Sequence, residues 1–122
     1  MSRVIPFDLL GEEAKLELGD IVGRLKNAGL DLYVISLVKE DDATTTYVNF
    51  RILNLPYVIQ IFVDVDKLTP GEILEEINRQ MYNRLHNSMR LYDETKAICE
   101  NIYEKLRRSG DVKEINNSSD EE

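Results

Sequence analysis

The stretch DVDKLTPGEILE, residues 64–75, holds the side chains of this chain that come nearest to a metal-binding pattern. Asp64 and Asp66 open it and Glu75 closes it at the twelfth place, as in calcium-binding loops that lie between two helices. Those loops also need an oxygen donor at the fifth place and glycine at the sixth, where this stretch has leucine and threonine. We therefore expect no calcium site here.

The second half of the same stretch has the composition of a helix start. Thr69 can act as an N-cap, Pro70 suits the first helical position, and Glu72 completes a capping box three residues after the threonine. The segment therefore predicts a junction between a strand and a helix, with Asp64 and Asp66 in solvent at the end of the strand.

The chain has one cysteine and one histidine, which leaves few ways to build a nucleophilic site. A lone cysteine forms neither an intramolecular disulfide nor a zinc site. Cys99 and His86 fall in one segment with helical periodicity, so they would lie about 20 Å apart along the axis and on opposite faces. We expect a buried thiol, a solvated imidazole and no catalytic pair.

The acidic residues that stand near lysines do not give a nuclease pattern either. Metal-dependent nuclease cores place carboxylates and a lysine together on neighbouring strands. Here the second predicted strand, residues 45–53, offers no acid to pair with Asp64, and Glu13 and Lys15 fall on a helix. Double-stranded-RNA-binding domains, which have a similar order of elements, use basic residues at the start of their last helix, where this chain has glutamates. The sequence predicts a protein that is not an enzyme, with no catalytic residue, cofactor or metal.

The net charge of −8 over 122 residues favours basic partners and disfavours nucleic acid. Half of that charge lies in residues 110–122, which hold five acids and one lysine. These residues have few apolar side chains to offset the entropy of ordering. We therefore expect a single domain at residues 1–109, followed by a disordered acidic tail.

Apolar runs in the chain are short. The N-terminal residues lack the apolar core of a secretory signal, and no run approaches the roughly 20 residues of a membrane span. We therefore expect a cytoplasmic protein with no membrane partner.

Periodicity predicts the first of the elements that would position these groups. Apolar residues recur every three to four positions from about Leu9 or Glu12 to Ala28, which indicates a helix. Asp8 is a suitable N-cap, and Gly29 can adopt the left-handed conformation that often follows a helix.

Three strands are predicted after that helix, at residues 31–38, 45–53 and 57–65, where apolar residues alternate or run continuously. Their connections are too short for parallel crossovers, so the strands should form an antiparallel meander. One face of this sheet is apolar throughout. The other face is half apolar, with Val58 and Phe62 on it, so we expect another molecule or element to cover it.

The last predicted element is one helix from Thr69 to about Arg108, because apolar residues keep the same helical phase without glycine or proline over residues 72–109. The fold class is then α+β: an N-terminal helix, a three-stranded antiparallel meander and a long C-terminal amphipathic helix. Such a helix would be about 60 Å long, twice the about 30 Å of the strands.

That excess length leaves two solutions. The helix bends near residues 86–88 and folds back, or a second copy of the chain covers the overhanging apolar stripe. The unbroken phase favours a homodimer. The expected interface residues are Met81, Leu85, Ser88, Leu91, Tyr92, Cys99, Ile102 and Leu106.

We therefore expect a non-catalytic protein-interaction or regulatory protein that acts as a homodimer and binds another protein with a basic surface. The residues expected to contact that partner lie in the first hairpin loop and along the third strand and its end: Glu40, Asp41, Asp42, Val58, Phe62, Asp64 and Asp66.

Three alternatives stay open. Small acidic α+β inhibitors carried by viruses, including anti-CRISPR proteins, resemble this chain in size and element order, which implies an inhibitor or nucleic-acid mimic. Small acidic secretion chaperones, which are dimers that bind substrates through apolar surface, resemble it more loosely. A nucleic-acid-binding protein would use the basic and polar stripe of the long helix, formed by Arg79, Asn83, His86 and Arg90.

Overall fold

The three predicted strands form an antiparallel meander in the computed structural model, which describes residues 3–41 and 45–110. They are β2 (Leu32–Lys39), β3 (Thr46–Ile52) and β4 (Ile59–Asp64). Their alternation sets the two faces of the sheet. Val48, Phe50 and Ile52 of β3 are fully buried on one face, so that face is the core side, as predicted.

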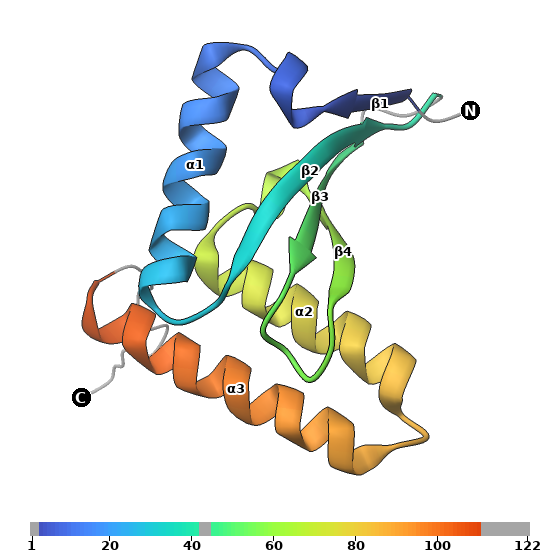
Figure 1. The fold of residues 1–122 in the computed structure, drawn as a ribbon, viewed down its shortest axis with the longest axis vertical. Helices are drawn as coiled ribbons and strands as arrows, with labels where there is room; N and C mark the ends of the chain where they lie inside the picture. The colour runs from blue at the N-terminus through green and yellow to red at the C-terminus, as the bar shows by residue number, and fades with distance from the viewer. Residues whose placement is uncertain (1–2, 42–44, 111–122) are drawn as a thin grey trace, which may run out of the picture.

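A fourth strand was not predicted. β1 (Arg3–Pro6) pairs antiparallel with the second half of β2, with Val4 opposite Val38, and gives the sheet order β1-β2-β3-β4 (Figure 1). The expectation of three strands is therefore wrong. Four residues that end in a proline carry no readable alternation, and only the free edge of β2 makes them a strand.

The first helix, α1 (Glu12–Asn27), follows a short 3₁₀ turn at Phe7–Leu9. Its N-cap is Gly11, so the predicted cap Asp8 is wrong because that residue belongs to the turn before. The end is as predicted: Gly29 has φ +108°, a conformation that glycine adopts without the steric penalty of a side chain. Leu18 and Leu25 are buried on the inner side of the helix.

The predicted single helix of the C-terminal half is two helices, α2 (Pro70–Leu85) and α3 (Met89–Arg108). The chain turns at residues 86–88, where Ser88 N donates to Leu85 O over 2.7 Å, and α3 returns alongside α2 (Figure 1). Tyr82 and Tyr92 meet edge to face across the pair, with ring centroids 5.2 Å apart. The expectation of one helix over residues 69–108 is therefore wrong.

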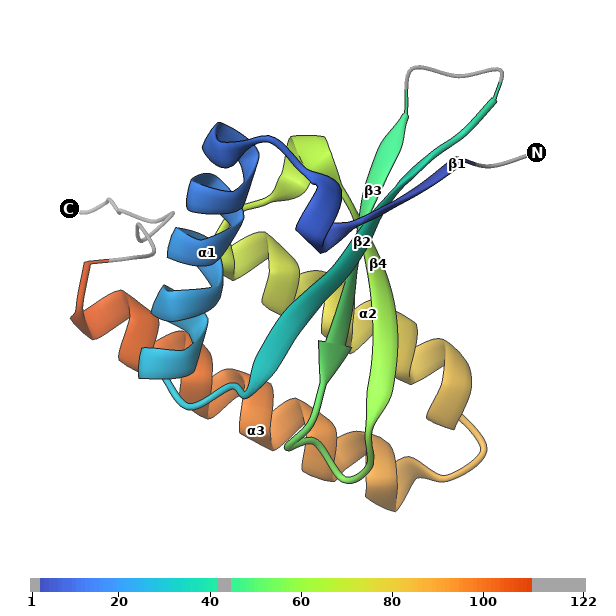
Figure 2. The same ribbon diagram turned by 45° about the horizontal axis from the view of Figure 1, so that its top comes forward.

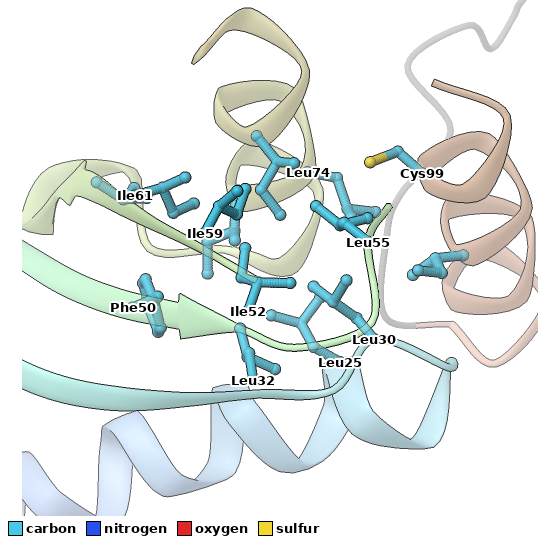
Figure 3. Packing of buried hydrophobic residues seen from close by; sticks show 14 of the residues in the cluster. Leu25, Leu30, Leu32, Phe50, Ile52, Leu55, Ile59, Ile61, Leu74 and Cys99 are labelled. Atoms are coloured by element: carbon cyan, nitrogen blue, oxygen red, sulfur yellow. The ribbon is translucent and has the colours of Figure 1, made fainter. Parts of the chain in front are cut away.

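Folding back removes the length problem within one chain. Both helices bury their apolar stripes in a core that they share with the sheet and α1 (Figure 3). Leu74 of α2 and Cys99 of α3 contribute to it, as does Leu55 from the loop between β3 and β4. Helical periodicity shows which side of each helix is apolar, but it does not show whether the two axes are continuous.

The junction between β4 and α2 is as predicted. Asp64 accepts a hydrogen bond from Asp66 N at 2.9 Å and opens a short 3₁₀ turn, Val65–Lys67. Thr69 Oγ1 then accepts from Glu72 N at 3.3 Å and lies 3.0 Å from Glu72 Oε1, with proline at the first helical position. Residues 64–75 thus form the turn after β4 and the start of α2.

Candidate functional site

One face of the sheet is covered by no helix of the described chain. α1 contacts β2, α2 contacts β4 and α3 packs against α2, so all three helices lie on the core side (Figure 2). We call the other side the open sheet face. The side chains that the strand register places on it are Val4, Pro6, Tyr33, Ser36, Val38, Tyr47, Asn49, Arg51, Gln60, Phe62 and Asp64.

Exposed apolar side chains gather on and beside the open sheet face. Tyr33 on β2 is 45% exposed, Phe62 on β4 is 41% exposed and Val4 on β1 is 60% exposed. Val58, immediately before β4, and Leu53, immediately after β3, extend the surface and are also exposed. Isolated exposed apolar residues are ordinary, but several on one face favour contact with another molecule.

The centre of the open sheet face holds an unsatisfied polar group. Asn49 on β3 lies between Ser36 on β2 and Phe62 on β4, and it is only 8% exposed. Its Oδ1 is buried and has no hydrogen-bond partner in the described part of the chain. A buried amide oxygen without a donor lowers the stability of the fold by about 1–3 kcal/mol. A covering molecule that donates a hydrogen bond to Asn49 could recover this free energy once the neighbouring side chains shift.

The β4 edge of the sheet is closed to strand addition. Gln80 Nε2 of α2 donates to Phe62 O at 2.8 Å, and Arg84 Nη2 donates to Gln60 O at 3.0 Å. These side chains occupy backbone carbonyls that an added strand would need. Strand addition is therefore not expected at the β4 edge.

The predicted partner-binding residues divide into two groups. Phe62 and Asp64 lie on the open sheet face and Val58 beside it, as expected for a mixed face that takes a partner. Glu40 and Asp41 lie beyond the end of β2, at the same end of the sheet as Asp64 and Asp66. Asp42 lies outside the described residues, as do residues 111–122, the predicted disordered tail.

Most of the predicted dimer-interface residues are buried within the subunit. Exposed fractions are 7% or less for Met81, Leu85, Cys99, Ile102 and Leu106, which belong to the core. Leu91 and Tyr92 pack against that core, and Ser88 lies in the turn between the helices. The surplus apolar stripe that motivated a homodimer is therefore absent, because the helix folds back.

The residues of the nucleic-acid alternative do not form a free basic stripe. Arg79 and Arg90 are on different helices, and each is paired with a neighbouring glutamate: Arg79 Nη2 with Glu76 at 2.6 Å, and Arg90 Nη1 with Glu94 at 3.0 Å. The hydrogen bond from Arg79 also holds the pKa of Glu76 below its ordinary value. His86 Nδ1 lies 3.1 Å from the carbonyl oxygen of Asn83.

The single cysteine of the chain is buried. Burial, with a smaller contribution from the charge of Glu100, raises the pKa of the Cys99 thiol to about 12. At neutral pH this thiol is protonated and unreactive. Within residues 3–41 and 45–110, no group of three or more histidine, cysteine, aspartate or glutamate residues is arranged to hold a metal ion.

Two further findings bear on identity. No helix among the described residues is long and apolar enough to cross a bilayer. Comparisons of the chain with protein-family models, curated proteins and solved structures return no match. The surface of the chain itself is therefore what points to a function.

Proposed function

We propose that this chain is a non-catalytic protein-interaction protein and that the open sheet face is its docking surface. The observation that carries the proposal is the group of exposed apolar side chains on a sheet face that no described element covers. The buried Asn49 amide at its centre adds an unmet hydrogen bond. Both features favour a partner that brings apolar contact and at least one donor.

The size of the open sheet face indicates a transient interaction. Four strands at ~4.8 Å spacing and about six residues at ~3.3 Å give a surface of roughly 20 by 20 Å. Two partners would then bury roughly 800 Å² in all, below the ~1,200 Å² of standard stable complexes. A partner that binds and leaves fits this area better than a permanent subunit.

A homodimer through the same face is the second candidate. Arg51 and Asp64 lie on one face of the same sheet, so two copies packed face to face could place each cation near the other copy's carboxylate. The Asn49 amide, which both donates and accepts, could pair with its own copy in the same way. The small area predicts that such a dimer would be weak.

An acidic inhibitor or nucleic-acid mimic is a third candidate, and its support is local. Glu40, Asp41, Asp64 and Asp66 gather at one end of the sheet. A mimic would compete with nucleic acid for a basic protein, and neutralising these four residues would abolish the competition. Binding that depends on the apolar residues of the face would favour the first candidate instead.

The proposal is tested with matched baits in affinity capture. Phe62→Asp places a charge on the open sheet face, next to Asn49, where the native side chain is 41% exposed and the fold should tolerate it. Leu16→Asp makes the same kind of change on the exposed side of α1, away from that face. Partners should be lost with the first bait and retained with the second. Equal capture by both baits would contradict the proposal.

A further inference from the structure

The edge of the sheet at β2 is covered over only half of its length. β1 pairs with residues 36–39 of β2, and residues 32–35 have no strand beside them on the side away from β3 (Figure 1). α1 lies next to this uncovered half (Figure 1). The β4 edge is closed by Gln80 and Arg84, whereas no side chain of the described residues donates to the backbone of this half of β2.

A pocket of about 260 Å³ lies between α1 and the uncovered half of β2. None of the six residues that line it is charged, and the Tyr33 hydroxyl is the one polar side-chain group among them. An apolar cavity of about 150 Å³ is enough to hold benzene, so this pocket has room for one large apolar side chain. The lining residues are Phe7, Leu18, Gly19, Val22, Tyr33 and Val34.

Gly19 leaves the pocket open on the side of α1. A Cβ atom at this position would meet no heavy atom within 4 Å, so a larger side chain would have space there. Glycine in the interior of a helix costs about 1 kcal/mol relative to alanine. α1 is thus weakened at the position where a side chain of its own would otherwise fill the pocket.

The backbone of Val34 is directed toward the uncovered edge. Leu53 N donates to Asp31 O at 2.8 Å, so the backbone of Asp31 faces β3. Successive residues of a strand direct their backbone groups to opposite sides. Tyr33, which pairs with Arg51, therefore also faces β3, and the N–H and C=O of Val34 point away from it. The irregularity in β2 comes after Val34, so it does not change this alternation.

These two backbone groups have no partner across the edge. No hydrogen bond on the side away from β3 joins Val34 to another residue in the described part of the chain. Val34 is only 9% exposed, and more than about 90% of buried backbone polar groups in proteins are paired. An unpaired donor and acceptor at a strand edge match the backbone of another extended chain. A lipophilic small molecule could fill the pocket, but it would leave both groups unpaired.

We propose that the pocket between α1 and the first half of β2 binds an extended segment of a partner protein. One leucine-sized side chain of that segment fills the space beside Gly19, and its backbone pairs with the N–H and C=O of Val34. Pairing of the main chain supplies affinity, and the pocket selects the side chain. The pocket shares only Tyr33 with the open sheet face, so this proposal does not depend on the role proposed for that face.

The test is a titration of the full chain with the blocked tripeptide acetyl-Ser-Leu-Ser-amide, followed in ¹H–¹⁵N correlation spectra. Saturable shifts should centre on Gly19, Val22 and Val34. Acetyl-Ser-Ala-Ser-amide should bind at least about tenfold more weakly, because it lacks the large apolar side chain. The leucine peptide methylated at its leucine nitrogen should bind about fivefold more weakly, because it loses the donor to the Val34 carbonyl.

A matched pair of variants tests the pocket from the side of the chain. Gly19→Leu should fill the space and remove saturable binding. Gly23→Leu, one turn later and outside the pocket, should leave the affinity within about twofold. Both variants should fold, because a Cβ atom meets nothing within 4 Å at either glycine and leucine is the better helix former. The urea midpoint of each should not fall below that of the parent.

Three results would overturn the proposal. The first is equal binding of the leucine peptide to the two glycine variants. The second is binding of 3-methylbutanol, which lacks peptide groups, as tightly as the leucine peptide. The third is the same pattern of shifts when the protein concentration alone is raised, which would show that a second copy occupies the pocket. Phe62→Asp should bind the peptide normally, so failure here is distinguishable from failure of the sheet-face proposal.

Discussion

At the scale of the residue, two buried side chains show how the surroundings set chemical behaviour. Asn49 and Cys99 are both nearly inaccessible, yet one is polar without a partner and the other is a potential nucleophile. For Cys99 the surroundings suppress reactivity, because a thiolate in an apolar core lacks solvation. For Asn49 they create an unmet hydrogen bond on a face that is otherwise available to another molecule.

The Cys99 thiol should therefore resist labelling in the native protein. Its pKa of about 12 means that the favourable burial of the neutral thiol is fully present below the ordinary value of 9.0 and is lost as pH rises toward 12. At about pH 8, a thiol reagent should react with Cys99 in the native protein only as fast as the fold opens. In denaturant, the same thiol should react immediately. Rapid labelling without denaturant would show that α3 does not pack as described.

At the scale of the element, the decisive feature is the turn between α2 and α3. No glycine or proline marks it, and Ser88, at φ −135° and ψ 80°, lies outside the helical conformation. The turn lets residues at the far end of α3, such as Leu106, enter the same core as α1. A continuous helix would have left half of the apolar stripe in water.

Leu106→Ala tests this arrangement, because Leu106 is fully buried within one subunit. The variant should lose about 2–4 kcal/mol of unfolding free energy from lost burial and a residual cavity. Urea denaturation at two protein concentrations measures it, and the midpoint should be the same at both. Leu16→Ala, at a site 72% exposed, should stay within about 0.5 kcal/mol of the parent. A midpoint that rises with protein concentration would instead indicate that Leu106 packs against a second copy.

At the scale of the whole molecule, the fold has two layers: one four-stranded sheet and a set of helices on one side of it (Figure 2). A sheet usually buries one face and can leave the other in water when its strands are antiparallel. Here the second face is apolar enough to invite contact but small. The helices cover the opposite face, so the open sheet face is the side of the sheet that a partner can reach.

The small open face predicts that the chain is mainly a monomer in dilute solution. Light scattering coupled to size exclusion should give the mass of one chain at about 10 μM, since an interface of roughly 800 Å² is too small for a stable dimer. Any association at higher concentration should be lost in Phe62→Asp. A stable dimer that survives this substitution would contradict the monomer prediction and place the contact elsewhere.

The sequence by itself determined the local elements. Alternation in β3 and β4 placed Phe50 in the core and Phe62 on the other face, and the residues from Thr69 to Glu72 marked the start of α2. These features depend on neighbouring residues, whose periods of 2.0 and 3.6 can be read directly. The half-apolar second face was also predictable, because every strand residue that is not in the core must point to it.

Only the tertiary structure decided the rest. β1 exists because β2 offers it an edge, and α3 folds back because the core can bury both halves of the predicted helix. A groove between α2 and α3, lined by Glu75 and Glu100, also follows from that reversal, because these residues are 25 positions apart in sequence and a continuous helix would hold them far apart. Periodicity specifies which side of an element is apolar, whereas the surface that covers it is chosen by the packing of the whole chain.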